Sequence, residues 1–207
     1  MTTSAPSPAQ LAILAELSGH LEPGTYLAGG VAVALELHHR TSLDIDLFVP
    51  QDFDPPALFE RLVQAAPDAI LTGEARGTLH LEVHGIPVSV IAYRYPMVGP
   101  PRTLAGVAVP VASTADLVCM KLAAIGGRGA TKDFWDLDEL LRAGAADGTL
   151  ASALDLFQRK YPSRDLAHVV KALAYFGDAD AAPLPVGLTP EHWARLKERT
   201  LERVRAL

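Results

Sequence analysis

Two aspartates and a pair of glycines form the most chemically informative pattern of the chain. Asp44 and Asp46 alternate with apolar residues, and Gly29-Gly30 precedes them with thirteen intervening residues. Residues two apart on a strand point to the same face, so the two carboxylates are expected side by side. Two like charges at that distance are costly unless a cation lies between them or one takes a proton. Ligands that are all oxygen favour Mg²⁺ or Mn²⁺, so the pattern predicts a divalent cation site.

The glycines predict a close approach of the backbone to a ligand. They follow the apolar segment Tyr26-Leu27-Ala28, and an apolar-rich helix is expected directly after them. Glycine lacks a Cβ, and the first turn of a helix offers free N–H groups to phosphate. The alternative is a solvent-facing edge strand with an unrelated glycine turn. Arg40-Thr41-Ser42 directly precedes the aspartates. Under that alternative, the glycines, the helix and these residues would all stand near the aspartates by chance.

A lysine and two aspartates form a second unusual pattern. Lys121 is the only charged residue between Asp116 and Arg128, and at about 100° per residue it falls on the apolar side of its expected helix. A lysine there must reach solvent or meet an anion, either a phosphate or a carboxylate. On the next expected helix Asp133 falls inside the apolar stripe and Asp136 at its edge. Such aspartates cap a neighbouring helix, orient a lysine or act as a base.

The elements expected around these residues have an α+β order. A helix begins near Ser7-Pro8, a strand ending at Pro50 carries both aspartates, and two strands meet near His84-Gly85 in a tight turn. Residues 178–187 are the best internal linker. The other helices are expected over residues 56–65, 131–143, 150–160, 164–176 and 190–206.

Composition excludes several classes of protein. Hydrophobic residues make up 49% of the 207 residues and charged residues 20%, which excludes a mainly disordered chain. A formal charge of −6 disfavours a nucleic-acid coat or a polybasic membrane binder. The single cysteine, Cys119, lies in an apolar run and is expected to be an inert hydrophobe. No Lys or Arg precedes Arg40 and no apolar stretch is long enough to span a bilayer, so a soluble cytoplasmic protein is expected.

The segment from Leu27 to Val49 resembles the first motif of the AbiEii/AbiGii toxin-type nucleotidyltransferases, a branch of the DNA polymerase β-like superfamily. The resemblance implies a polymerase β-like core, a small mixed sheet flanked by helices, over residues 1–110. A helical region over residues 111–207 would pack on it. It also implies that Asp44 and Asp46 hold the metal, Mg²⁺ or Mn²⁺. The residues implied for binding the nucleoside triphosphate, with ATP among the candidates, are Gly29, Gly30, Arg40 and Ser42.

Lys121 and the segment Lys132-Asp133-Phe134-Trp135-Asp136-Leu137 are similar to two later motifs of the same family. The resemblance implies that Lys121 and Lys132 contact nucleotide phosphates and that Asp136 also belongs to the nucleotide-binding residues. It also implies that Asp133 or Asp136 completes or supports the catalytic site. One departure is that many polymerase β-like enzymes have a third metal-binding carboxylate on a later strand, where this chain has Ser89. The expected hairpin places Glu82 on the same face as Ser89, where it either substitutes for that carboxylate or is a surface residue.

The activity implied by the resemblance is transfer of a nucleoside monophosphate from the triphosphate to an acceptor, with release of pyrophosphate. The implied role is the toxin of a toxin–antitoxin or abortive-infection system, with RNA or another macromolecule as acceptor and a cognate antitoxin as partner. Two alternatives stay open: a catalytically inert relative that binds nucleotide or protein, and a small-molecule nucleotidyltransferase of the antibiotic type.

Several other charged residues are expected to face solvent. Asp138, Glu139 and Arg142 lie opposite the apolar stripe of their helix. The last expected helix has an apolar side and a basic remainder, which is typical of a docking helix with a solvated face. If the acceptor is RNA, the first candidates for contacting it are Arg195, Lys197, Arg199, Arg203 and Arg205.

Overall fold

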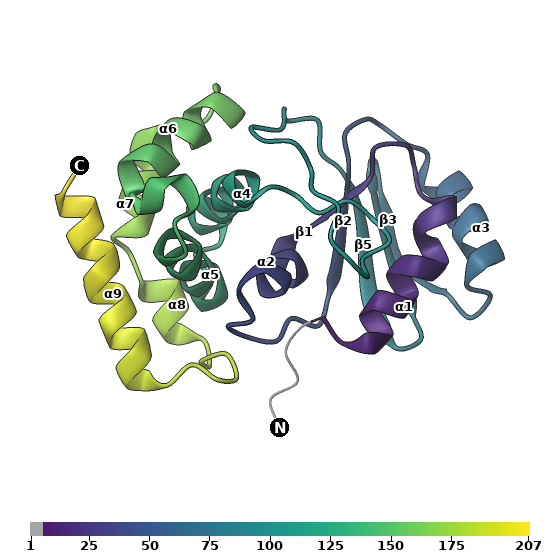
Figure 1. The fold of residues 1–207 in the computed structure, drawn as a ribbon, viewed down its shortest axis with the longest axis horizontal. Helices are drawn as coiled ribbons and strands as arrows, with labels where there is room; N and C mark the ends of the chain where they lie inside the picture. Colours follow the sequence, from purple (N-terminus) through teal and green to yellow (C-terminus); the bar gives the residue numbers. More distant parts are fainter. Residues whose placement is uncertain (1–5) are drawn as a thin grey trace. The chain divides into compact units, whose positions relative to one another are not determined.

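A five-stranded mixed sheet forms the centre of the first of two compact units, which ends at Ser113 (Figure 1). The computed structural model describes residues 6–207. The strand order is β1-β2-β5-β4-β3, in which β2 and β5 are parallel and the other neighbours antiparallel. The predicted α+β class with a small mixed sheet is confirmed. The strands are β1 (Tyr26–Ala28), β2 (Ile45–Val49), β3 (Ile70–Ala75), β4 (Thr78–Val83) and β5 (Ile86–Ala92).

Helices cover both faces of this sheet, with α1 and α3 on one face and α2 on the other (Figure 1). Apolar side chains alternate along β2 and explain why α1 and α3 cover the first face. Ile45, Leu47 and Val49 lie on that face and are fully buried. Leu14 of α1 and Leu62 of α3 are also fully buried, and burial of each such side chain contributes about 1.5–3 kcal/mol. The helices of this unit are α1 (Pro8–Leu17), the short 3₁₀ helix η1 (Ser18–His20), α2 (Gly29–Leu37) and α3 (Pro55–Ala65).

The hairpin between β4 and β5 has the turn that its sequence predicts. His84 and Gly85 both have positive φ, 51° and 79°, which is the type I′ geometry favoured by the twist of paired strands. Between residues 70 and 95 the sequence analysis named only these two strands and missed β3 at the edge of the sheet. Ile70 and Leu71 of β3 are 59% and 41% exposed, so this strand lacks the buried face on which a period-two prediction depends.

The second unit, Thr114–Leu207, is helical. Its helix α4 contacts α5, α6 and α7. The linker predicted over residues 178–187 is partly wrong, because α8 begins at Gly177. Asp180 of that helix accepts a hydrogen bond from Trp193 Nε1 at 2.7 Å. The helices are α4 (Thr114–Gly127), α5 (Thr131–Arg142), the 3₁₀ helix η2 (Ala145–Gly148), α6 (Leu150–Lys160), α7 (Leu166–Leu173), α8 (Gly177–Ala181) and α9 (Pro190–Arg205).

Cys119 on α4 is buried, and burial raises the pKa of its thiol to about 12. The burial agrees with the expectation of a small hydrophobe, and the raised pKa disfavours the thiolate, which is the reactive form. Within residues 6–207, the structure contains no helix with the length and apolar character needed to cross a bilayer.

Candidate active site

Asp46 lies in the interior of the sheet of the first unit, between β1 and β5. In the strand register it is opposite Ala28 on β1 and Ser89 on β5. Ser89 is in turn opposite His80 on β4, and His80 Nδ1 lies 3.0 Å from Ser89 Oγ. Residues in one register row point to the same face of a sheet. A carboxylate, a hydroxyl and an imidazole therefore follow one another across one face.

Ser89 stands beside Asp46, in the row where the sequence analysis sought a third carboxylate. Glu82 lies two residues from His80 on β4, on the same face and opposite Pro87. Among the residues that the structure describes, no group of three or more His, Cys, Asp or Glu side chains could hold a metal ion. Two carboxylates still suit Mg²⁺, which keeps several waters and takes its other ligands from substrate phosphates. The donor set of Asp44 and Asp46 therefore fits a cation that arrives with a nucleotide.

Gly29 packs directly against the carboxylate of Asp46. A Cβ at this position would lie 2.2 Å from Asp46 Oδ2, and the φ of Gly29 is +69°. Both the space and the left-handed backbone require glycine. Since Gly29 is the first residue of α2, the Asp46 carboxylate lies at the amino-terminal end of that helix.

Gly30 brings the other half of the motif to the same helix end. A Cβ on Gly30 would lie 2.4 Å from Ser42 Oγ and 2.9 Å from Arg40 Nη2. Arg40 Nη1 also donates a hydrogen bond to the carbonyl of Thr41 at 2.9 Å. The structure therefore brings together the diglycine, Arg40, Ser42 and Asp46, although these residues lie on three separate segments of the chain.

Asp44 is placed differently from the expectation. The strand predicted to carry both aspartates begins at Ile45, so Asp44 lies just before it and is exposed. Asp46 is half-buried within the ladder. The alternation of side chains along a strand therefore sets the direction of Asp46, while the direction of Asp44 depends on the segment that precedes β2.

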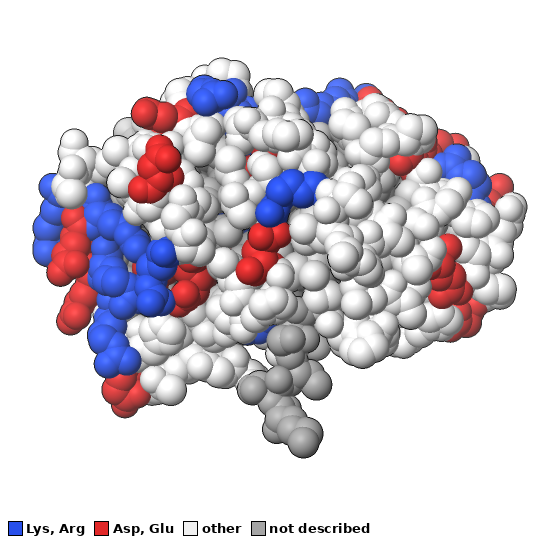
Figure 2. All heavy atoms as spheres, in the orientation of Figure 1, with Lys and Arg blue, Asp and Glu red and all other residues white. Residues whose placement is uncertain are grey.

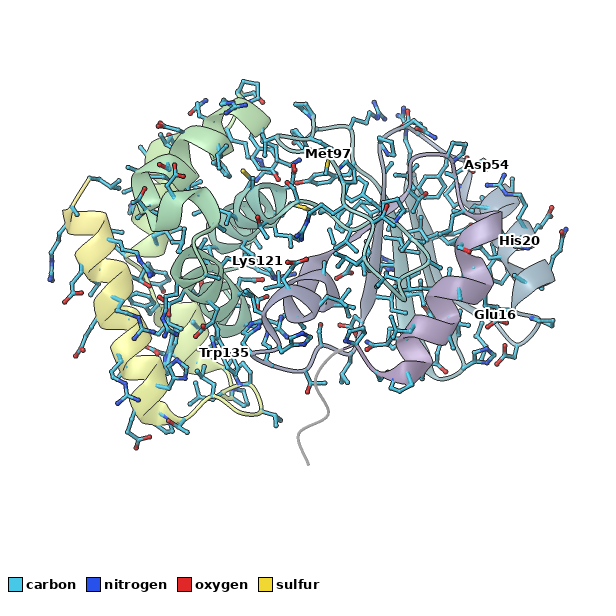
Figure 3. The ribbon with its side chains drawn as sticks, viewed as in Figure 1. Glu16, His20, Asp54, Met97, Lys121 and Trp135 are labelled. Carbon is cyan, nitrogen blue, oxygen red and sulfur yellow. The ribbon has the colours of Figure 1, made fainter. Side chains whose placement is uncertain are left out.

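In the second unit, Lys121, Asp133 and Asp136 form a buried ion-pair cluster between α4 and α5. Lys121, labelled in Figure 3, places its Nζ 3.2 Å from Asp133 Oδ1 and 2.6 Å from Asp136 Oδ2. Both aspartate side chains are 0% exposed and the lysine side chain is 6% exposed. Of the partners considered for Lys121, the structure shows the carboxylate. Lys132, by contrast, is exposed on α5.

Arg128 completes this cluster, and the sequence analysis missed it. Its Nε and Nη2 donate to the two carboxylate oxygens of Asp133 at 2.8 and 2.9 Å. Burial would raise the pKa of Asp133, but the Arg128 hydrogen bonds and the Lys121 charge outweigh it and hold that pKa below its ordinary value. Asp133 is therefore ionised at neutral pH. The signal available in the sequence was an arginine five residues before an inward-facing aspartate.

The prediction that Asp138 faces solvent is wrong. It is 1% exposed and accepts hydrogen bonds from Arg199 Nε at 3.2 Å and Arg203 Nη1 at 2.6 Å. Burial would raise the pKa of Asp138, but these two guanidinium groups hold it below its ordinary value. The reason for the error is that α9 packs against the polar side of α5, which the pattern of α5 alone does not reveal.

The basic last helix is correspondingly less available than expected. Arg199 and Arg203 bind Asp138, and Lys197 Nζ lies 2.9 Å from Asp180 Oδ1. Figure 2 shows a group of positive side chains over α9 with negative side chains beside it. Three of the five cations suggested for RNA contact are therefore bound within this unit.

A cavity of about 280 Å³ lies between the end of α4 and α7. Its lining includes Arg128, His168, Lys171 and Tyr175. Arg128 thus contributes to the cavity wall while it also binds Asp133, and its side chain is 60% exposed. The lining also includes Asp178, so the cavity combines cationic and anionic side chains with an exposed aromatic ring.

Comparison with known proteins relates most of the chain to one family. Residues 12–103 and 73–206 match the family described as nucleotidyl transferase AbiEii toxin of type IV toxin–antitoxin systems. An uncharacterised protein of Aquifex aeolicus is 35% identical over 156 residues, which cover 74% of each chain.

Two solved structures share the fold. The nucleotidyltransferase toxin MenT4 of Mycobacterium tuberculosis is 19% identical with a TM-score of 0.65, covering 96% of this chain and 82% of that one. The antibiotic-resistance factor ANT(2″)-Ia is 15% identical with a TM-score of 0.54, covering 72% of this chain and 89% of that one. The chain belongs to the AbiEii family of nucleotidyltransferase toxins, as the diglycine and Asp-x-Asp motifs predicted.

Proposed function

We propose that this nucleotidyltransferase moves a nucleoside monophosphate from a triphosphate to RNA, with Asp44 and Asp46 as the metal ligands. An acceptor oxygen forms a bond to the α-phosphorus, the bond from that phosphorus to the β-phosphate bridging oxygen breaks, and pyrophosphate leaves. The acceptor proton passes to solvent. The observation that supports the proposal is the packing of Gly29 against the Asp46 carboxylate at the start of α2, since backbone N–H groups and a metal-binding carboxylate are then adjacent.

Asp44 and Asp46 would hold Mg²⁺ together with water and phosphate oxygens. When bound, such a cation stabilises negative charge on the transferred phosphoryl group. The residues of this chain bind and orient the triphosphate. The first N–H groups of α2 would donate to its oxygens, and Arg40 supplies positive charge beside Gly30.

The cluster of the second unit has a supporting role in this proposal. Exposed Lys132 would contact a nucleotide phosphate directly, whereas Lys121 would reach a phosphate only by exchanging one of its carboxylate partners for it. Because Asp133 and Asp136 are fully buried against Lys121, we assign them to orienting that lysine rather than to contact with the nucleotide. In this scheme residues 1–110 are the catalytic core and residues 111–207 a helical region.

We propose RNA as the acceptor, with the cavity between α4 and α7 as its contact. Lys171 and His168 line that cavity, and Arg128 remains 60% exposed there although it binds Asp133. The three α9 cations that bind Asp138 or Asp180 are less exposed. The proposed reaction takes place in the cytoplasm, where triphosphates and RNA are found. The partner expected of a toxin in such a system is a cognate antitoxin. The small-molecule alternative fits less well, since the resistance factor shares the fold at 15% identity while the toxin family matches most of the chain.

The test is transfer of label from each α-³²P-labelled triphosphate, with Mg²⁺, to total RNA, total protein or an aminoglycoside mixture. Label in RNA that disappears with Asp44→Asn and with Asp46→Asn supports the proposal. The matched control is Asp52→Asn, an exposed aspartate of the same unit that pairs with Arg94. Transfer that survives both active-site substitutions rejects the assignment, and label in the aminoglycoside fraction alone rejects RNA as the acceptor.

A further inference from the structure

Gln10 on α1 is a buried polar residue that reaches a segment far along the chain. It is 3% exposed. Its side-chain Nε2 donates hydrogen bonds to the carbonyl oxygens of Ser42 at 2.9 Å and Leu43 at 3.0 Å. A primary amide has two N–H donors, so both donors of Gln10 are used on two consecutive carbonyls directly before Asp44.

The other end of the same amide is held as well. Gln10 Oε1 accepts a hydrogen bond from the backbone N–H of Ser7 at 2.8 Å, and Ser7 Oγ accepts from the backbone N–H of Gln10 at 3.2 Å. This is the reciprocal capping box at the start of α1. The amide therefore has one orientation, because a flip would place its oxygen against the two carbonyls.

The segment that Gln10 holds is otherwise weakly anchored. The β2 ladder begins at Ile45, so strand pairing does not reach residues 42–44. The side chain of Leu43 is 73% exposed, so hydrophobic burial does not hold it in place. The two hydrogen bonds from Gln10 tie this backbone to α1, which is itself packed through fully buried Ile13, Leu14 and Leu17.

We propose that Gln10 is a positioning residue for the active site. By fixing the carbonyls of Ser42 and Leu43, it sets the direction of the Asp44 carboxylate and holds the Ser42 hydroxyl against Gly30. It does not contact substrate itself. The inference rests on the proposed function of Asp44 and Asp46.

The chemistry of the amide makes the proposal testable by near-isosteric substitution. Gln10→Glu keeps size and shape, but a carboxylate has no donor and faces two carbonyl oxygens. Gln10→Met keeps the length without charge. The matched control is Gln51→Glu, because Gln51 Nε2 also donates to a backbone carbonyl, that of Pro23 at 3.0 Å, and is exposed in the same unit.

The experiment compares these three variants with Asp44→Asn and the wild-type chain. Binding of Mn²⁺ alone is measured by electron paramagnetic resonance, and transfer is measured as kcat and KM with the folded fraction determined by circular dichroism. We expect Gln10→Glu and Gln10→Met to weaken Mn²⁺ binding and lower kcat by about tenfold per folded molecule. Gln51→Glu should leave both unchanged.

The outcomes separate this inference from the proposed function. If Asp44→Asn weakens Mn²⁺ binding and transfer while both Gln10 variants keep wild-type values, the positioning role is overturned and the function stands. If the lower activity of the Gln10 variants is accounted for by their unfolded fraction alone, the role is likewise overturned. If Asp44→Asn changes neither quantity, both the proposed function and the inference that rests on it are rejected.

Discussion

The acidic residues of the two units differ in burial and in what surrounds them. Asp44 is exposed and Asp46 is half-buried next to a glycine helix start. In the second unit, the side chains of Asp116, Asp133 and Asp136 are 0% exposed and each lies within ion-pair distance of a lysine. A buried carboxylate needs such a partner because desolvation otherwise disfavours its charge.

The comparison shows how the same residue type serves two purposes. The second unit uses aspartate–cation pairs to join its helices, as Asp138 joins α5 to α9 through Arg199 and Arg203. In the proposed function, the two motif aspartates of the first unit take up a cation and a phosphate from outside. Substitutions should therefore separate activity from stability according to the unit in which they lie.

The largest effect is expected at Asp46. Asp46→Asn should lower transfer by about 1,000-fold, because an amide loses the charge that a metal ligand supplies. The melting temperature should change by less than about 2 °C, since the side chain keeps its shape. Transfer assays and thermal unfolding measure the two quantities. If Asp46→Asn lost much stability but kept transfer, Asp46 would have the structural role that we assign to the aspartates of the second unit.

At the buried pair of Asp116 and Lys160 we expect a loss of stability whose free energy is comparable to that of the loss of transfer at Asp46. Lys160 Nζ lies 2.7 Å from Asp116 Oδ1 and both side chains are 0% exposed. Asp116→Asn should lower the free energy of unfolding by about 3–5 kcal/mol, because it leaves a buried ammonium without its carboxylate. Urea unfolding measures this change.

Two further variants sharpen that prediction. Asp155→Asn removes an exposed aspartate of α6 in the same unit and should change stability by less than about 0.5 kcal/mol. The double variant Asp116→Leu/Lys160→Met should recover most of the lost stability, since hydrophobic pairs replace buried ion pairs well. Equal stability of Asp116→Asn and Asp155→Asn would show that burial does not distinguish these acids.

The next effect is expected at Gly29, where the first unit depends on the absence of a side chain. Gly29→Ala should cost about 2 kcal/mol, because φ is +69° and the new Cβ would meet Asp46 Oδ2. Gly85→Ala is the control, since Gly85 has φ +79° but open space around it. If both variants lose the same stability and Gly29→Ala keeps full transfer, the close packing on Asp46 is unimportant.

Lowering the pH is expected to have a smaller effect on the free energy of unfolding. Despite burial, Arg128 and Lys121 lower the pKa of Asp133, and Arg199 and Arg203 lower that of Asp138. A carboxyl whose pKa is lower in the folded state stabilises it fully above its unfolded pKa of about 4, and this contribution is lost as pH falls through the folded pKa. Stability should therefore fall below about pH 4. In urea unfolding from pH 7 to 3, Arg199→Gln should flatten the dependence, and an unchanged slope would contradict the assignment.

The smallest effect is expected at the hairpin turn of the first unit. His84 Nε2 lies 2.9 Å from Glu16 Oε2 and its Nδ1 lies 2.7 Å from Asp68 Oδ2; Glu16 is labelled in Figure 3. Hydrogen bonds to Glu16 and then Asp68 raise the pKa of His84. This exposed group therefore stabilises the fold below its unfolded pKa of about 6.5, and the contribution is lost as pH rises through the folded pKa.

Thermal unfolding between pH 5 and 9 tests this. His84→Asn tolerates the positive φ and should remove the small pH-dependent part of the melting temperature. His20→Asn, on η1, should leave it in place. A wild-type melting temperature that is flat across this range would show that the contact contributes nothing.

Local sequence patterns were sufficient to predict those features of the structure that depend on residues close together in the chain. The helix start near Ser7-Pro8 and the turn at His84-Gly85 could be read from a few residues each. The inward position of Lys121 followed from helical periodicity. The family followed from the spacing of the diglycine and the Asp-x-Asp motif.

The sequence by itself therefore determined the fold class, the family and the residues worth testing, because periodicity and motif spacing are local properties. Only the tertiary structure decided which side chains meet across 30 or more positions. Gln10 reaches Ser42 and Leu43, and Asp138 is enclosed by Arg199 and Arg203. A polar residue on a helix shows the same local pattern whether it faces water or a distant partner, since the partner is chosen by how the elements pack.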